Sequence, residues 1–183
     1  PSDKREAAGD NLSECYPDAP WIEGGRFPLV VFNHGLSSYR ESNSFLCLEL
    51  VSQGYLVLAV GHPYDACCAE LDDGTCIFFD GELSKKQYDP LWGGMLKALQ
   101  LTHSKGTDRE LAQQFDALQQ RYCKLILSRV AEWEQDTLDA VKYAQQAFGD
   151  RIDGSAGIGA TGHSLGGGVG ATLSVEDACF FCG

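Results

Sequence analysis

Two continuous apolar runs on either side of one helix-like segment constrain the fold of this 183-residue chain more than any other feature. Phe27–Phe32 reads FPLVVF and Tyr55–Val60 reads YLVLAV. Uninterrupted runs of this length are typical of strands buried on both faces of a mainly parallel sheet. Between them, residues 40–53 carry apolar side chains at helical spacing and end before Gly54. Strand, helix and strand in this order predict a right-handed βαβ unit.

The second half of the chain predicts helices around one more buried strand. Leu111–Leu127 has a helical pattern. After it, side chains at steps of three and four share one helix face, which we expect in the core: Val130, Trp133, Thr137, Val141, Ala144 and Phe148. Ile158–Thr161 is predicted to be a short strand, and a helix is predicted to begin at Leu165.

Residues 65–106 show no clear period and are interpreted as a long irregular excursion. Loops of this length inside a compact domain are usually functional or disordered. We therefore expect one partial domain over residues 1–183, with a lid or insertion at 65–127 that is rich in aromatic and leucine side chains.

Residues 162–166 read G-H-S-L-G, the G-x-S-x-G pattern in which a serine sits on a sharp strand-to-helix turn. A side chain at either outer position would collide with the neighbours of that turn, so both positions are glycine. A serine nucleophile also needs a histidine base oriented by a carboxylate, and N–H donors for the oxyanion. We place these donors at the backbone N–H of Leu165, directly after Ser164, and of Leu36, in the loop after the first strand.

The four histidines are candidates for the base, at positions 34, 62, 103 and 163. His34 lies in a strand-end H-G turn and is interpreted as a side chain that braces the loop. His103 lies in the excursion, from which it could reach the site as part of a lid. His163 is expected to point away from the neighbouring hydroxyl. Asp177 lies roughly 20 Å from Ser164 along the intervening helix, so we expect a surface or cap residue there.

Composition and charge exclude several partner classes. The chain has 26 acidic and 14 basic residues, and this net charge of −12 argues against nucleic acid or an anionic membrane surface as partner. No stretch approaches 18 uninterrupted apolar residues, so we expect no transmembrane segment. The eight cysteines are irregularly spaced, which favours free thiols, with a loop disulfide from Cys67 or Cys68 to Cys76 as the alternative. The histidines are not at zinc-ligand spacing, and the expected chemistry needs neither metal nor cofactor. The sequence favours no particular oligomeric state or compartment.

Three segments together resemble a known family. FPLVVFNHGLSSYRES, GYLVLAVGHP and GATGHSLGGGVGATL are similar to the platelet-activating-factor acetylhydrolase-like branch of bacterial α/β-hydrolase esterases, related to dienelactone-hydrolase-like enzymes. The resemblance covers about residues 17–64 and 128–176. It implies an α/β-hydrolase fold, with a mainly parallel sheet and helices on both faces. It also implies a carboxylic ester hydrolase that cleaves a short-chain acyl ester or a phospholipid acetyl ester through an acyl-enzyme.

Carried over by position, the resemblance implies Ser164 as the nucleophile, the Leu36 and Leu165 amides as the oxyanion hole, and His62 as a pocket wall rather than a base. In this family the acid and the histidine follow the strand after the serine helix, and an opening strand pair precedes the first apolar run. We therefore expect a chain that is incomplete at both ends, with the acid and base encoded beyond Gly183.

Two other function classes stay open. Gly157, Gly159 and Gly162 spell the G-x-G-x-x-G pattern of a dinucleotide-binding loop, although residues 151–156 upstream read as a polar turn rather than a buried strand. The other class is a non-catalytic binding protein built on the hydrolase fold, because the chain shows no triad acid or base.

Overall fold

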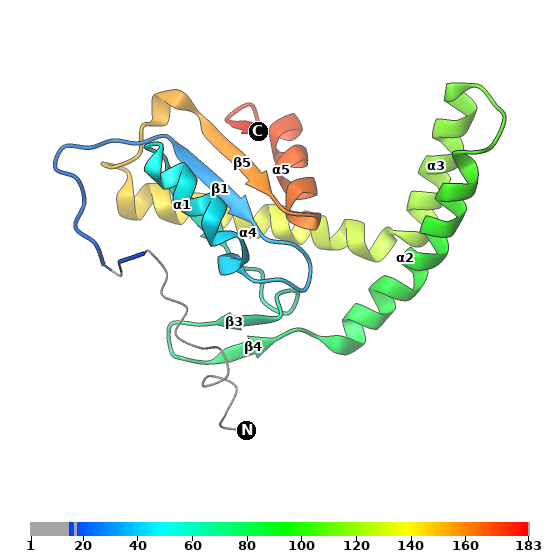
Figure 1. Cartoon of the computed structure of the whole chain (residues 1–183), viewed down its shortest axis with the longest axis horizontal. Coiled ribbons are helices and arrows are strands. Elements are labelled where there is room, and N and C mark those ends of the chain that lie inside the picture. The colour runs from blue at the N-terminus through cyan, green and yellow to red at the C-terminus, as the bar shows by residue number, and fades with distance from the viewer. Residues whose placement is uncertain (1–14, 17, 183) are drawn as a thin grey trace.

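A four-stranded parallel sheet lies at the centre of the computed structural model, which describes residues 15–16 and 18–182 (Figure 1). Its strands are, in spatial order, β2 (Leu56–Val60), β1 (Leu29–Asn33), β5 (Ile158–Gly162) and β6 (Phe180–Cys182). All three pairings are parallel. Every residue of β1 is buried, as its continuous apolar sequence predicts for a central strand. The predicted βαβ unit is therefore confirmed.

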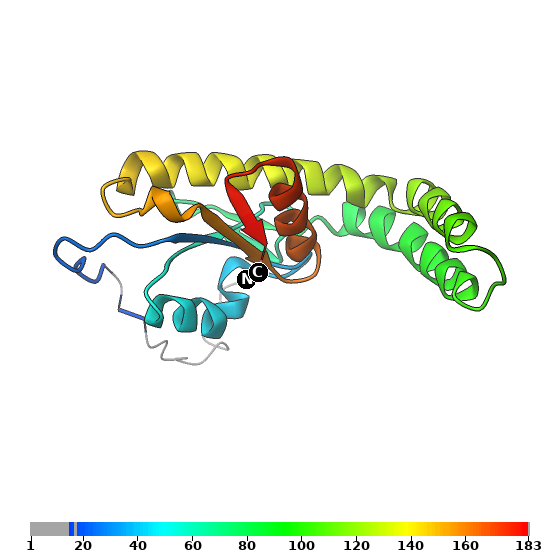
Figure 2. The same ribbon diagram turned by 90° about the horizontal axis from the view of Figure 1, so that it is seen from above.

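Helices cover both faces of this sheet. The 3-10 turn η2 (Arg40–Asn43) leads into α1 (Ser44–Ser52), and the 3-10 turn η3 (Gly154–Ala156) precedes β5. Figure 2 shows α1 on the opposite side of the sheet from α4 (Lys124–Phe148), which packs against α5 (Leu165–Glu176).

The helix face predicted on α4 does form the core. Trp133, Thr137, Val141 and Ala144 are all buried, and Trp133 has no exposed surface. The outer positions of the stripe are less covered: Val130 is partly buried and Phe148 remains 38% exposed. Burial of one α4 face against the sheet thus explains the period of three and four in its sequence.

The segment predicted to be irregular is in fact ordered. Residues 65–106 contain an antiparallel hairpin of β3 (Cys68–Glu70) and β4 (Cys76–Phe78), followed by the 21-residue helix α2 (Gly81–Leu101). Pro90 and the Gly93–Gly94 pair lie inside α2. Proline and glycine disfavour helix interiors, so these residues hide the helical period from a sequence reading.

Helix α3 (Asp108–Tyr122) packs against α2, and the two form a helical arm that projects away from the sheet (Figures 1 and 2). The prediction of a single helix over Leu111–Leu127 is wrong, because the helix is interrupted at Cys123, between α3 and α4. The start of α3 had a readable signal: Thr107 and Glu110 form a capping box.

Two further expectations can be compared with the described residues. None of their helices has both the length and the apolar character that crossing a bilayer requires. Cys67, Cys68 and Cys76 are all free cysteines, so Cys76 forms no loop disulfide with Cys67 or Cys68.

Candidate active site

Three strands of the sheet end at the same level. Asn33 at the end of β1 pairs in register with Val60 of β2 on one side and with Gly162 of β5 on the other. The segments that follow these strands therefore meet at the carboxyl edge of the sheet, where open α/β sheets place their ligand and catalytic sites.

Ser164 occupies a strained turn between β5 and α5. Its φ is 54° and its ψ is −116°, a conformation that non-glycine residues rarely adopt. Such strain costs on the order of 1–3 kcal/mol and persists only where the surroundings enforce it. Ser164 is exposed at the N-cap of α5, so its hydroxyl lies at the positive end of the helix dipole.

The two glycines of the G-x-S-x-G pattern are enforced by close backbone contacts. A Cβ at Gly162 would lie 2.6 Å from the carbonyl oxygen of Asn33, and one at Gly166 would lie 2.2 Å from the same atom. No side chain fits at either distance. The steric reason that the sequence predicts for the pattern is thus confirmed in the geometry of the turn.

The loop after β1 packs directly against this serine turn. The backbone N–H of His163 donates to the carbonyl oxygen of Asn33 at 3.0 Å. Gly35 faces the same residue so closely that a Cβ there would lie 2.7 Å from His163 Nδ1. Leu36 therefore follows a residue in contact with the serine turn. Among the described residues, no acceptor is hydrogen-bonded to the N–H of Leu36 or of Leu165.

His34 is a buried neutral ring inside that loop. It has no exposed surface, and burial lowers the pKa of its imidazole below the ordinary 6.5. Its Nε2 lies 3.2 Å from the backbone nitrogen of His62, and its Nδ1 lies 2.7 Å from the carbonyl oxygen of Gly35. The expectation that His34 braces the loop agrees with these contacts.

His62, which the sequence analysis reads as a pocket wall, is a buried side chain at this edge. It has no exposed surface, and its Nδ1 lies 2.9 Å from the Asp136 carboxylate and its Nε2 lies 3.0 Å from Asn33 Oδ1. Its ring stacks on Trp133 with 3.9 Å between centroids and 5° between planes. Both ring nitrogens and one ring face of His62 are therefore occupied by protein partners.

A second buried polar group joins the loop after β2 to α4. Asp65 is 1% exposed, and its Oδ2 accepts from Arg129 Nε at 2.7 Å and from Trp133 Nε1 at 2.8 Å. Its backbone carbonyl also accepts from the N–H of Ser37 at 2.7 Å. The loops after β1 and β2 are thus tied to each other and to α4 through one carboxylic residue.

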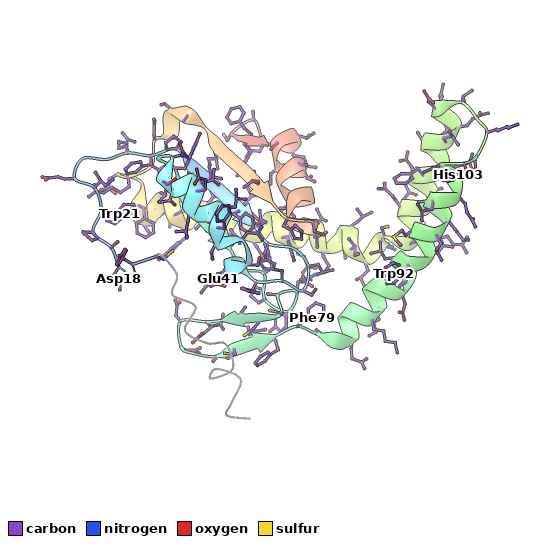
Figure 3. The ribbon with its side chains drawn as sticks, in the orientation of Figure 1. Asp18, Trp21, Glu41, Phe79, Trp92 and His103 are labelled. Carbon is purple, nitrogen blue, oxygen red and sulfur yellow. The ribbon has the colours of Figure 1, made fainter. Side chains whose placement is uncertain are left out.

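The remaining candidates lie away from the serine. His103 is exposed at the end of α2, where Figure 3 shows it on the helical arm, far from the sheet edge; it is not brought to Ser164. Asp177 is the C-cap of α5, at the opposite end of that helix from Ser164, as its spacing predicts. His163 is exposed and packs against Gly35. Within the described part of the chain, no histidine is hydrogen-bonded to the Ser164 hydroxyl.

The dinucleotide reading is also corrected. In that class the glycine loop follows a strand and opens a helix. Here Gly157 precedes β5, Gly159 lies inside it and Gly162 ends it, so the pattern runs through the strand itself. The glycines form no loop that could cradle a pyrophosphate.

The network contains residues that sequence reasoning missed, namely Asn33, Asp65, Arg129 and Asp136. Their partners lie far away in sequence: His62 and Asp136 are 74 residues apart, and Asp65 and Arg129 are 64 apart. The sequence offered one indication of this network on α4, where residues 129, 133, 136 and 137 share a helix face. Polar side chains on a face that packs against the sheet need hydrogen-bond partners there.

A cavity of about 380 Å³ lies beside this edge. It is lined by residues from the loops after β1 and β2 and from β3: Tyr39–Glu41, Gly61, Pro63 and Ala66–Leu71. The first part of the segment expected to be a lid or insertion therefore borders this cavity, whereas no described residue of the helical arm lines it.

The parallel sheet, the helices on both faces and the serine turn after β5 define an α/β hydrolase. The family model of platelet-activating factor acetylhydrolase, isoform II, matches residues 5–183, and the chain belongs to that family. The family resemblance read from the sequence is confirmed.

Curated relatives carry the name platelet-activating factor acetylhydrolase. The protein from Cavia porcellus is 28% identical over 166 residues, which cover 91% of this chain and 36% of the relative. That from Canis lupus familiaris is 25% identical over 173 residues, with the same coverage of 91% and 36%. That from Gallus gallus is 36% identical over 72 residues, or 34% of this chain and 17% of the relative. The chain spans about a third of the length of the first two relatives.

Proposed function

We propose that the protein hydrolyses carboxylic esters with Ser164 as its nucleophile. The observation that carries the proposal is the conformation of Ser164, an exposed serine held at a φ of 54° by glycines that leave no room for a side chain. Strain of this kind at a helix N-terminus is maintained by the surrounding structure, and it is typical of a nucleophile elbow.

In the proposed reaction, Ser164 Oγ attacks the ester carbonyl and gives its proton to a histidine base. The carbonyl oxygen becomes an oxyanion, which accepts hydrogen bonds from the N–H groups of Leu36 and Leu165. Collapse of this intermediate releases the alcohol, which takes up the proton, and leaves an acyl-enzyme that water hydrolyses. The freedom of both amides from acceptors in the described residues supports these two roles. No described contact assigns the base or its carboxylate.

The proposed substrate is a lipid ester with a short acyl group. The name of the relatives specifies an acetylhydrolase that acts on platelet-activating factor, and we extend this activity to the full-length protein. Within residues 1–183 we keep one partial hydrolase domain with an insertion at 65–127, and we place part of the substrate in the cavity lined by Tyr39, Pro63 and Ala66–Leu71.

The test replaces Ser164 with alanine in the full-length protein. Ser164→Ala should lower kcat on an acetyl phospholipid by about 10⁶-fold and abolish labelling by a fluorophosphonate, because no other group can form the acyl-enzyme. The control is Ser174→Ala on the same helix, whose hydroxyl bonds the Gly170 carbonyl at 2.9 Å and which should retain both activities. Esterase activity that survives in Ser164→Ala would refute the proposal.

Labelling of the 183-residue chain alone is a second measurement. Rapid labelling at Ser164 would mean that a base within this chain reaches the hydroxyl. Absence of labelling in the folded chain, with labelling in the full-length protein, would mean that the base comes from elsewhere in the full-length protein. A full-length protein that binds the lipid ester but neither cleaves it nor reacts with the label would instead be a binding protein on the hydrolase fold.

A further inference from the structure

The peptide between Gly35 and Leu36 has to keep one orientation for the proposed function. The peptide unit is planar and trans, so the Gly35 carbonyl and the Leu36 N–H point in opposite directions. A rotation of this peptide would turn the N–H away from the site and present a carbonyl oxygen there, which would repel an oxyanion. Gly35 makes such a rotation easy, because glycine has the widest backbone freedom.

Gly35 also lies directly against the serine turn. A Cβ on Gly35 would lie 2.7 Å from His163 Nδ1 and 3.4 Å from the carbonyl oxygen of His163. A larger residue at position 35 would have to displace the exposed His163 ring, so the most flexible residue lies where the loop meets the serine turn. The orientation of the peptide has to be fixed by something other than its own backbone preference.

Two donors hold the Gly35 carbonyl. His34 Nδ1 lies 2.7 Å from this oxygen, and the backbone N–H of Ser38 donates to it at 2.9 Å. With the carbonyl held on this side, the planar peptide directs the Leu36 N–H to the other side. No described residue accepts a hydrogen bond from that N–H.

The proton on the His34 ring can be assigned from its other nitrogen. His34 Nε2 faces the backbone N–H of His62 at 3.2 Å, and a backbone N–H can only donate. Nε2 must therefore be bare, and in a neutral ring the proton lies on Nδ1, where it faces the Gly35 oxygen. Burial keeps the ring neutral by lowering the pKa of His34, as does the nearby His62, against the opposing effects of the Gly35 hydrogen bond and of Asp65 and Glu41.

Neighbouring rings hold this imidazole in place. The Trp133 ring meets it edge-on at 5.1 Å between centroids, and the His62 ring does so at 5.2 Å. The strand end of β2 supplies the N–H that selects the tautomer, and α4 supplies the aromatic wall. The ring can thus neither rotate nor exchange its tautomer without breaking a contact.

We propose that His34 is a positioning residue for the oxyanion hole: its Nδ1–H holds the Gly35 carbonyl, and the Leu36 N–H is thereby kept directed at the reacting oxygen. This inference rests on the proposed esterase function and goes beyond it, because it assigns the role, the tautomer and the peptide on which His34 acts.

Two substitutions at His34 separate this role from mere packing. In His34→Asn, the amide nitrogen can take the place of Nδ1 and still donate to the Gly35 oxygen. In His34→Gln, the longer side chain brings its amide to the place of Nε2, where it meets the His62 N–H and leaves the Gly35 oxygen without this donor. Both variants keep a buried amide at this position, and each retains one of the two hydrogen bonds of the ring. Asn keeps the bond to the Gly35 oxygen that the proposal concerns, and Gln keeps the bond from the His62 N–H.

In the full-length protein, His34→Gln should lower kcat on an acetyl ester by about 10- to 100-fold, less than the ~10²–10³-fold that follows deletion of an oxyanion donor, because Ser38 still holds the carbonyl. KM should change little, and the rate of phosphonylation by a fluorophosphonate should fall in parallel with kcat. His34→Asn should retain kcat within about 3-fold. His103→Gln on the helical arm is the matched control and should behave as the wild type.

The pH profile separates a positioning role for His34 from the role of general base. His34 does not accept the serine proton in this proposal, so the rate of His34→Gln should fall by the same factor at every pH, with the apparent pKa values of kcat/KM unchanged. A general base becomes inactive when it is protonated, so a shifted or lost acidic limb would show that His34 is the base and would overturn the proposal.

Equal kcat in the wild type and in a folded His34→Gln would also overturn it, as would equal loss in the Gln and Asn variants with both folded. Should either variant fail to fold, ¹⁵N NMR of the wild-type histidines decides: the proposal requires a proton on Nδ1 and none on Nε2 of His34. Failure of the esterase proposal itself shows separately, as activity that survives in Ser164→Ala.

Discussion

The carboxyl edge of the sheet and the helical arm differ in how closely their atoms are packed and in how many polar side chains they bury. At the edge, backbone atoms of the loop after β1 and the serine turn approach each other so closely that two glycines cannot be replaced, and polar side chains such as His62 and Asp65 are buried with partners. On the arm, Trp92 and Leu96 are 59% and 61% exposed, and the charged side chains face solvent (Figure 3). Precise positioning of atoms is confined to the edge, and substitutions should therefore have very different effects in the two regions.

The largest difference is expected at glycines of α5 near the edge. Gly166→Ala would place a Cβ 2.2 Å from the Asn33 carbonyl oxygen and 2.4 Å from that of His34, and backbone atoms cannot move aside cheaply. We expect a loss of about 4 kcal/mol in the free energy of unfolding, measured in urea. Gly168→Ala, two residues along the same helix, meets nothing within 4 Å and should raise stability by up to about 1 kcal/mol. Similar losses in both variants would mean that contact with the loop after β1 does not distinguish the two positions.

Asp65→Asn should produce the next largest effect. The carboxylate is 1% exposed and carries the charge that balances Arg129, whose side chain is 15% exposed. Removing it leaves a largely buried guanidinium whose one remaining ion pair, among the residues that the structure describes, is with the exposed Glu132. We expect the free energy of unfolding to fall by about 2–3 kcal/mol. On the arm, the exposed Asp116→Asn should change it by less than about 0.5 kcal/mol. A stable Asp65→Asn protein would show that the Trp133 and Arg129 hydrogen bonds survive on a neutral amide.

The same contrast explains how far the sequence could be read. Strands β1 and β2, the α4 core face and the serine turn follow from local patterns, because a buried strand, an amphipathic helix and a tight turn each restrict neighbouring residues. The pairs His62–Asp136 and Asp65–Arg129 could not be read, since contacts between residues 74 and 64 positions apart leave no local period. In α2 the signal was present but masked by Pro90 and Gly93. At α3 it was present and overlooked, in the capping box of Thr107 and Glu110.

That capping box offers the smallest and most local prediction. Thr107 Oγ1 accepts from the Glu110 N–H at 3.3 Å, and Glu110 Oε2 accepts from the Thr107 N–H at 2.9 Å. Thr107→Ala should weaken the start of α3 by about 1 kcal/mol. Hydrogen exchange should quicken in amides of residues 108–122 and stay unchanged in β1 and β5, and fluorophosphonate labelling of the full-length protein should be unaffected.

The contribution of this capping box to the stability of α3 should depend on pH in a defined direction. Hydrogen bonds from the backbone and hydroxyl of Thr107 lower the pKa of Glu110 below its ordinary 4.5. A carboxyl whose pKa is lower in the folded state contributes stability that is complete above the unfolded value and is lost as pH falls through the folded value. Protection of α3 should therefore decline below about pH 4.5 in the wild type and less so in Thr107→Ala. The control is Ser104→Ala, which removes a hydroxyl that donates to the Gln100 carbonyl and does not contact Glu110. Local opening of a projecting arm should leave the strained serine turn intact. If hydrogen exchange in β1 and β5 quickened together with exchange in α3, the arm and the edge would unfold as one unit. That result would refute the independence of the two regions.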